Sequence, residues 1–306
     1  PVRSLHIDTA RTWRGGQNQV LQLVTGLEER GDHATLVAHE AGELRQRAAE
    51  GLRYVGFLPR SEFDVGAAVK LSKPAFLAAI AKAPLLFDPG TDWEYGFSTD
   101  ILGLVIEAIE VRPLGQVLSD RLWRPLGMTD TQFALPASEA GRYARAFVDD
   151  PGTDARQPTM AHASGRAQQW ESGGGGGLST APDYLRFALM LLGRGRLGGE
   201  RVLGAKTVAL MTADHLPPVI PNRIAQTMDP AAAGYGFGLG FAVREHQGMS
   251  EWNGTPGEFY WGGYAGTFFF VDPKEQLIAV LLFQNPPVRN HYRALFRATV
   301  LQAIVD

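Results

Sequence analysis

The sequence predicts a mixed α/β (α+β) fold, and three observations predict it. Near the N-terminus, apolar runs at 3–8, 34–39 and 52–58 alternate with helical patterns, which implies parallel strands joined by right-handed crossovers. In the middle, the apolar residues of segment 101–109 recur at the spacing of one helix face. Towards the C-terminus, short apolar segments are separated by turn residues, as in an antiparallel sheet.

The N-terminal elements predict the opening half of a Rossmann-like βαβαβ unit. One helix is expected around Val20 to Leu27, closed at Gly31, and a second near 42–50. The pair Gly15-Gly16 precedes the first of these helices and could approach a phosphate there. A single pair of glycines is a weak signal, so no cofactor is expected.

The stretch from Leu85 to Phe133 is the most informative part of the chain. It opens with a predicted turn, Asp88-Pro89-Gly90-Thr91. Trp93 and Tyr95 follow, and Ser98, Thr99 and Asp100 are candidate caps for the helix at 101–109. We therefore expect Tyr95 on a rigid loop that leads into a packed helix.

The C-terminal half predicts helices and strands in alternation. Helices are expected at about 182–193, 205–213 and 290–304, and strands at 237–243, 259–262, 266–272 and 277–283, with a turn at Asp272 to Glu275. The last helix is expected to expose Arg293 and Arg297 and to bury Leu295, Phe296, Val300, Leu301 and Ile304.

Composition excludes several classes of partner. A net charge of −3 and a pI near 6.2 give no electrostatic reason to expect nucleic acid or an anionic membrane surface. There is no cysteine, and no carboxylate or histidine spacing suggests a metal site. No apolar run reaches the length of a membrane span, so the default expectation is a cytoplasmic protein.

Four segments carry a family resemblance: PGTDWEYGFSTDILGLVIEAIEVRPLGQVLSDRLWRPLGMTDTQF at 89–133, GGGGGLSTAPDYLRFALMLL at 173–192, YGFGLGFAV at 235–243 and WGGYAGTFFFVDPKEQLIAVLLFQ at 261–284. They resemble the penicillin-binding-protein and class C β-lactamase superfamily and, within it, the family VIII carboxylesterases. The resemblance implies a sheet flanked by helices, and a hydrolase whose substrate is a small-molecule ester or amide. It also implies that the glycines at 173–177 form a packing or site-proximal loop.

Residues 3–70 resemble a different family, the N-terminal domain of family 4 (GT-B) glycosyltransferases. This predicts an apparent chimera, with domains 1–70 and 71–306 joined near 67–76. The N-terminal fragment is expected to pack on or extend the hydrolase sheet, or two chains to cover each other in a homo-oligomer. The glutamate-containing donor motif of that family is missing, so a glycosyltransferase activity is the third reading.

The hydrolase resemblance implies a set of site residues. Tyr95 stands at the position of the family's proton-transfer tyrosine, although Phe97 replaces the expected asparagine. Trp261-Gly262-Gly263 stands at the oxyanion strand, and Trp93 is expected to line the substrate site with it. The alternatives are that Tyr95 only packs beside Trp93 and that the glycines mark a bulge.

The family's nucleophile is absent from the sequence. No serine has a lysine three residues on, and no Gly-x-Ser-x-Gly elbow occurs. The remaining serines in or near the family segments are Ser98, Ser164, Ser172 and Ser179. Ser98 and Ser179 are more simply caps of the helices that follow them, and His162 and His215 lie on polar loops. The first functional reading is thus a carboxylesterase-like hydrolase of doubtful competence, and the alternative is an inactive chimera with a binding or structural role.

Overall fold

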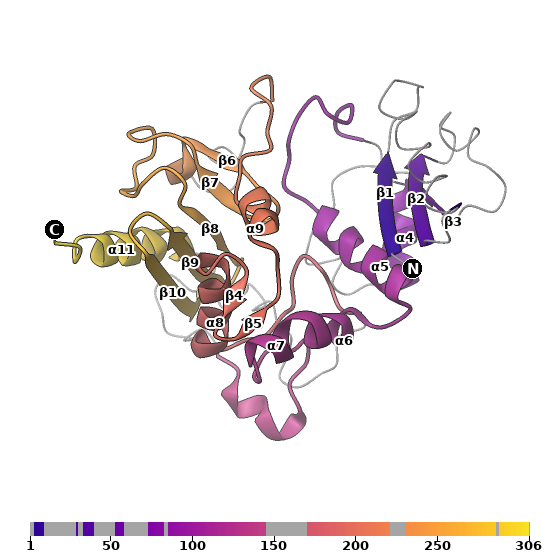
Figure 1. Ribbon diagram of the computed structural model, residues 1–306, viewed down its shortest axis with the longest axis horizontal. Helices are drawn as coiled ribbons and strands as arrows, with labels where there is room; N and C mark the ends of the chain where they lie inside the picture. Colours follow the sequence, from indigo (N-terminus) through magenta and orange to yellow (C-terminus); the bar gives the residue numbers. More distant parts are fainter. Residues whose placement is uncertain are drawn as a thin grey trace. The chain divides into compact units, whose positions relative to one another are not determined.

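The structure is a computed structural model that describes residues 3–8, 29, 33–39, 53–57, 73–82, 85–144, 170–220, 230–285 and 288–305. The chain divides into two compact units, residues 1–92 and 93–306, which are coloured along the sequence in Figure 1. These units do not coincide with the domains 1–70 and 71–306 expected from the sequence. The boundary after residue 70 stays a prediction.

The first unit contains a parallel sheet of three strands. β1 (Arg3–Asp8), β2 (His33–His39) and β3 (Arg53–Phe57) lie in the order β1-β2-β3, and both pairs are parallel. The three predicted strands and their parallel pairing are confirmed. The unit also contains helix α4 (Lys73–Lys82). The helices expected around 20–27 and 42–50 and the pair Gly15-Gly16 lie outside the described residues.

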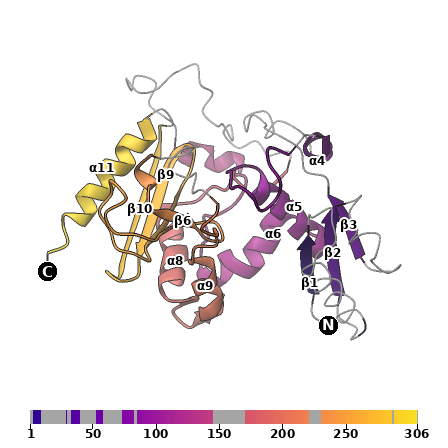
Figure 2. The same cartoon turned by 90° about the horizontal axis from the view of Figure 1, so that it is seen from above.

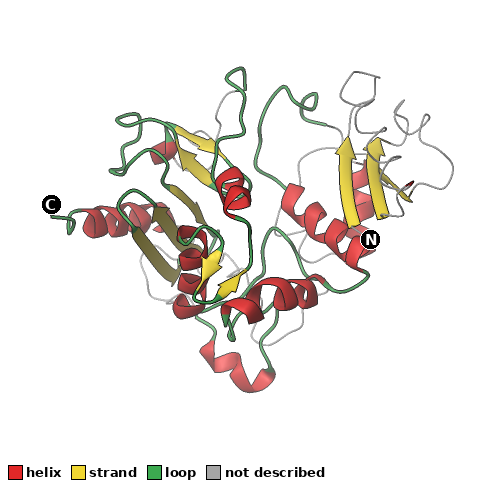
Figure 3. Ribbon diagram, viewed as in Figure 1, coloured by secondary structure: helices red, strands yellow, loops and turns green. Residues whose placement is uncertain are grey.

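The second unit is built on an antiparallel sheet in the order β10-β9-β8-β7-β6. Its strands are β6 (Tyr235–Phe237), β7 (Ala242–Arg244), β8 (Phe259–Gly262), β9 (Gly266–Asp272) and β10 (Leu277–Gln284), drawn in yellow in Figure 3. The strands predicted at 259–262, 266–272 and 277–283 are confirmed, as is the sheet flanked by helices.

The strand predicted at 237–243 is wrong, because this segment turns back on itself. β6 ends at Phe237 and β7 begins at Ala242, and the amide of Gly238 donates to the carbonyl of Phe241 at 2.8 Å. Gly240 has φ +97°, a conformation that favours glycine and that a continuous strand does not contain. Two short antiparallel strands therefore replace one.

The second unit also contains helices, and those nearest the sheet flank its two faces. The described helices are α5 (Ser98–Glu110), α6 (Leu114–Leu118), the π-helical turn η1 (Ser119–Trp123), α7 (Arg124–Leu126), the 3₁₀ helix η2 (Ala137–Arg142), α8 (Ala181–Leu192), α9 (Ala205–Met211), the 3₁₀ helix η3 (Pro230–Ala232) and α11 (Arg289–Leu301). A small hairpin of β4 (Arg196–Leu197) and β5 (Glu200–Arg201) follows α8. The predicted middle helix and the helices near 182–193, 205–213 and 290–304 are confirmed.

The predicted helix caps are wrong by small shifts. Ser98 to Asp100 form the first turn of α5, and its N-cap is Phe97, without a side-chain cap. At α8 the N-cap is Thr180 and not the adjacent Ser179, because the Thr180 hydroxyl accepts from the amide of Asp183 at 3.4 Å. Neighbouring hydroxyl residues compete for such positions.

The sheet separates two cores, and Figure 2 shows α11 and α8 on its opposite faces. On one face Phe259, Phe269 and Val271 pack with residues of α8 and of the segment 114–133. On the other face Tyr260, Phe268 and Phe270 pack with α11. This division follows from the alternation of side chains along a strand.

Helix α11 turns its arginines toward the sheet. Arg293 and Arg297 are buried, whereas Leu295 and Ile304 are exposed, so the orientation predicted for these four side chains is wrong. The remaining apolar residues of the prediction pack against the sheet core as expected: Phe296, Val300 and Leu301.

A buried carboxylate explains the orientation of Arg297. Glu258, with a relative exposure of 0%, forms an ion pair with Arg297 and lies 3.7 Å from Arg244 of β7. Tyr235 donates a hydrogen bond to the same carboxylate. Burial raises the pKa of Tyr235 above its ordinary value, so the phenol stays protonated and remains a donor. A buried charge is tolerated only with such partners.

The glycines after Ser172 pack against the start of α5. A Cβ on Gly173 would collide with the carbonyl oxygen of Thr99. A Cβ on Gly103 of α5 would lie 2.9 Å from the backbone nitrogen of Gly173. A Cβ on Gly174 would collide with the carboxylate of Asp100. The expectation of a packing loop is therefore confirmed for Gly173 and Gly174, and their contact fixes the helix that follows Tyr95.

We expect Glu258→Gln to destabilise the chain by about 3–5 kcal/mol, because Arg297 and Arg244 would be left buried without a negative partner. Urea unfolding measures the change. The exposed turn residue Glu275 provides the control, since Glu275→Gln should stay within about 0.5 kcal/mol of the unaltered chain. Equal midpoints for both variants would contradict the role given to the buried pair.

Gly173→Ala should lower the free energy of unfolding by about 1–3 kcal/mol, because the added methyl meets backbone that cannot move aside. Gly175→Ala is the matched control, since nothing lies within 4 Å of a Cβ built there. Thermal unfolding of both variants tests the contact. If Gly173→Ala unfolds at the same temperature as Gly175→Ala, the glycine run is not tightly packed on α5.

Candidate functional site

Tyr95 lies in the loop before α5 and rests on an indole of the sheet. Its ring centroid is 5.3 Å from that of Trp261 of β8, with the two planes tilted by 42°. The side chain is 40% exposed. Tyr95 is thus held by a ring contact and still open to a small molecule.

Trp93 reaches the same place through a fourth aromatic residue. Its ring lies 4.9 Å from that of Phe237 of β6, and Phe237 lies 5.4 Å from Trp261. Trp93, Tyr95, Phe237 and Trp261 therefore form one group of rings, called here the aromatic cluster. The sequence predicted three of these residues as neighbours. It did not single out Phe237, although the segment YGFGLGFAV that contains it was recognised as a family segment.

The electrostatics of the site keep Tyr95 protonated. Partial burial raises the pKa of Tyr95, a hydrogen bond from Trp261 opposes this shift, and the carboxylate of Asp100 adds to it. The pKa of Asp100 is itself raised by burial, against hydrogen bonds from Ser172 and the Gly174 amide. At neutral pH Tyr95 is consequently a proton donor and not a phenolate.

The two glycines after Trp261 leave room for protein atoms. A Cβ on Gly262 would meet the guanidinium of Arg293 at 2.6 Å, and one on Gly263 would meet the hydroxyl of Thr267. Arg293 donates hydrogen bonds to the carbonyls of Gly263 and, at 3.0 Å, of Thr267. These contacts fix the turn between β8 and β9. That the glycines also admit a substrate stays a prediction.

The candidate nucleophiles have structural partners. Ser172 donates to Asp100 and accepts from the amide of Gly174 at 3.1 Å. Ser179 lies 2.8 Å from the hydroxyl of Thr131, and Ser98 begins α5. The ring of His215 lies 2.7 Å from the carbonyl of Leu210. Ser164 and His162 lie outside the described residues.

Other kinds of site find no support among the residues that the structure describes. These residues contain no group of three or more His, Cys, Asp or Glu side chains that could hold a metal ion. None of the described helices is both long and apolar enough to cross a membrane.

Comparison with known proteins gives the family. The Beta-lactamase family profile matches residues 46–302. Protein Rv1367c of Mycobacterium tuberculosis is 37% identical over 215 residues, which cover 69% of this chain and 53% of that protein. Esterase EstB of Burkholderia gladioli is 30% identical over 223 residues, or 68% of this chain and 53% of the esterase. The chain spans about half the length of the curated relatives it matches.

Solved structures agree with this similarity. The chain superimposes on EstCE1, described as a hydrolase with promiscuous acyltransferase activity, with a TM-score of 0.60 and 28% identity over 78% of this chain and 62% of EstCE1. It also superimposes on simvastatin synthase (LovD) from Aspergillus terreus, with a TM-score of 0.59 and 25% identity over 86% of this chain and 65% of LovD. On the sheet, its helices and these matches, the chain belongs to the beta-lactamase family.

Proposed function

We propose that the chain is a carboxylesterase-like hydrolase that acts on small acyl esters at the aromatic cluster. The observation that carries the proposal is the position of Tyr95. Its ring contacts that of Trp261, its side chain is partly exposed, and burial raises the pKa of its phenol. The neighbouring rings of Trp93, Phe237 and Trp261 suit the apolar body of an ester, and the phenol can protonate its leaving alcohol. The esterase EstB and the hydrolase EstCE1 among its relatives support the same class of chemistry.

The nucleophile of this hydrolase remains to be assigned. In acyl transfer a serine passes its proton to a base and attacks the ester carbonyl, donors stabilise the resulting oxyanion, and the bond to the alcohol breaks as the alcohol oxygen is protonated. We propose that the backbone of Trp261-Gly262-Gly263 lies near that oxygen. No Ser-x-x-Lys motif occurs in the 306 residues, so a serine without the usual lysine would have to act.

This missing motif favours a second function, that of a binding protein without turnover. Such a protein would bind small esters at the aromatic cluster and release them unhydrolysed. Alternatively, it would bind a second copy of the chain. Soluble ester analogues that quench Trp261 fluorescence without hydrolysis would support this reading.

A chimeric origin is a further proposal about residues 3–70. It rests on their resemblance to glycosyltransferases and on the parallel order β1-β2-β3, which many α/β folds share. The match to the Beta-lactamase family begins at residue 46, upstream of the expected join, and none of the relatives given above is named a glycosyltransferase. A saturable nucleotide-sugar titration would support that origin, and flat binding would count against it.

We expect the full chain to hydrolyse p-nitrophenyl acetate and butyrate, and Tyr95→Phe to lower kcat/KM by roughly 100-fold or more, because the phenol's proton is lost. Tyr292→Phe is the matched control, since Tyr292 has the same exposure of 40% and lies on α11. A fluorophosphonate label mapped by mass spectrometry should mark one serine. Absence of both turnover and label would exclude the hydrolase and leave the binding protein.

The raised pKa of Tyr95 predicts its titration. The ultraviolet difference between the unaltered chain and Tyr95→Phe should show a tyrosinate whose midpoint lies above about 10, the ordinary value. Asp100→Asn should lower that midpoint, because the nearby negative charge that opposes ionisation is removed. A midpoint at or below the ordinary value would show that Tyr95 is not held protonated as described.

A further inference from the structure

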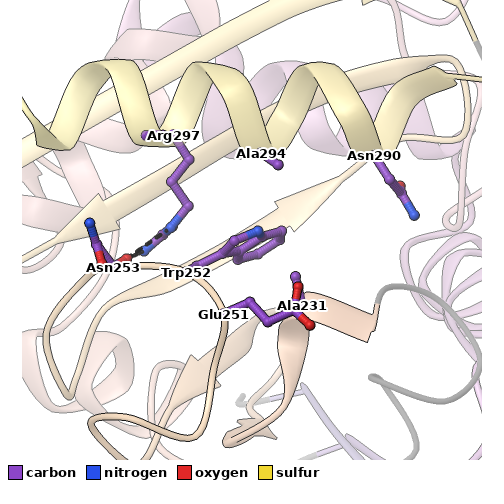
Figure 4. A pocket seen from close by; sticks show the side chains of 8 residues that line it. Ala231, Glu251, Trp252, Asn253, Asn290, Ala294 and Arg297 are labelled. Carbon is purple, nitrogen blue, oxygen red and sulfur yellow. Dashed lines mark hydrogen bonds between the residues drawn. The ribbon is translucent and has the colours of Figure 1, made fainter.

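A pocket lies on the α11 face of the sheet, and none of its lining residues belongs to the aromatic cluster. It is open, with a volume of about 570 Å³, and is formed by η3, the loop 251–253 and α11. Figure 4 shows the indole of Trp252 beneath α11, with Ala294 above it and with Ala231 and Glu251 on the opposite side. The proposed ester hydrolysis gives this pocket no role.

The walls of this pocket are fixed by hydrogen bonds. The hydroxyl of Ser250 donates to the carbonyl of Ala231 at 2.5 Å and accepts from the amide of Trp252 at 3.0 Å. Arg244 donates to the carbonyl of Trp252 at 2.8 Å, and Arg297 donates to the carbonyl of Asn253 at 2.7 Å. The loop is therefore held in place before any ligand arrives, which lowers the entropic cost of binding.

Two hydrogen-bond donors in the lining have no acceptor among the described residues. They are Nε1 of Trp252 and Nη1 of Arg297, both buried. The other nitrogens of Arg297 are occupied by Asn253 and Glu258. A buried donor without a partner is costly and uncommon in folded proteins, so each of them favours an acceptor supplied from the pocket.

The two donors belong to neighbouring side chains. The guanidinium carbon of Arg297 lies 5.2 Å from the centroid of a Trp252 ring, so a group with two acceptor oxygens could serve both. A carboxylate has two such oxygens, and an arginine favours it over a neutral carbonyl.

Small residues leave space for the rest of the ligand. Ala231, Ala294 and Ala298 line the pocket beside the Trp252 ring, so a short apolar chain has room there. Glu251, also in the lining, is exposed and would repel a second negative charge. We propose that this pocket binds a small monocarboxylate with a short apolar chain, its carboxylate on Trp252 and Arg297.

The test is nuclear magnetic resonance of the full chain with ¹⁵N-labelled tryptophan. The chain has six tryptophans, and Trp252→Phe identifies the indole signal of Trp252. We expect sodium butyrate to shift that signal saturably, with a dissociation constant on the order of millimolar for so small a ligand. Butyramide should bind with a dissociation constant at least tenfold higher, because it lacks the charge. Succinate should also bind more weakly than butyrate.

Two variants of α11 distinguish binding in the pocket from a general effect of altering the helix. Ala294→Leu fills the space beside Trp252 and should abolish the butyrate shift, while Leu295→Ala, on an exposed position of the same helix, should leave it unchanged. A butyrate shift that survives Ala294→Leu, equal shifts with butyramide, or no saturable shift would each overturn the proposal. The readout involves no ester hydrolysis, so it is independent of the function proposed above.

Discussion

The buried carboxylate of Glu258 is the constraint on which the second unit depends. It forms ion pairs with Arg297 of α11 and Arg244 of β7 and accepts a hydrogen bond from Tyr235 of β6. The two arginines also hold the carbonyls of the loop before β8. One buried charge thereby ties the closing helix to β6, β7 and the start of β8, because removing Glu258 would leave two buried arginines without a negative partner. The strand that carries Trp261 is fixed as part of this arrangement.

The aromatic cluster depends on that fixed strand. Trp261 of β8 and Phe237 of β6 present the rings on which Tyr95 and Trp93 rest. From the other direction, the contact of Gly173 with Gly103 sets the helix that follows Tyr95. The tyrosine is thus positioned from the sheet and from α5. Membership of the family accounts for this scaffold, whereas the chemistry has to be argued from the site itself.

Local sequence signals predicted the regular elements well and the irregular ones less well. The strands at 266–272 and 277–283 have strong apolar patterns and a clear turn between them, and the structure confirms both. The hairpin at 235–244 was missed because its glycines interrupt the strand without a polar turn between. At the site, Trp93, Tyr95 and Trp261 do lie together. Phe237 was not predicted, because nothing local distinguishes it from an ordinary strand residue.

The sequence by itself determined the family, through the resemblance of four of its segments. It also determined the strands at 266–272 and 277–283 and a closing helix near 290–304, since these follow from local apolar patterns and spacing. Only the tertiary structure decided which side of that helix is buried. Hydrophobicity assigns Arg293 and Arg297 to solvent and Leu295 to the core, but the structure buries the arginines and exposes the leucine. The physical reason is that the acceptors of these arginines lie on the sheet side of the helix: the carboxylate of Glu258 and the carbonyls of Gly263 and Asn253. Partners so distant in the chain cannot be recognised from the sequence of the helix alone.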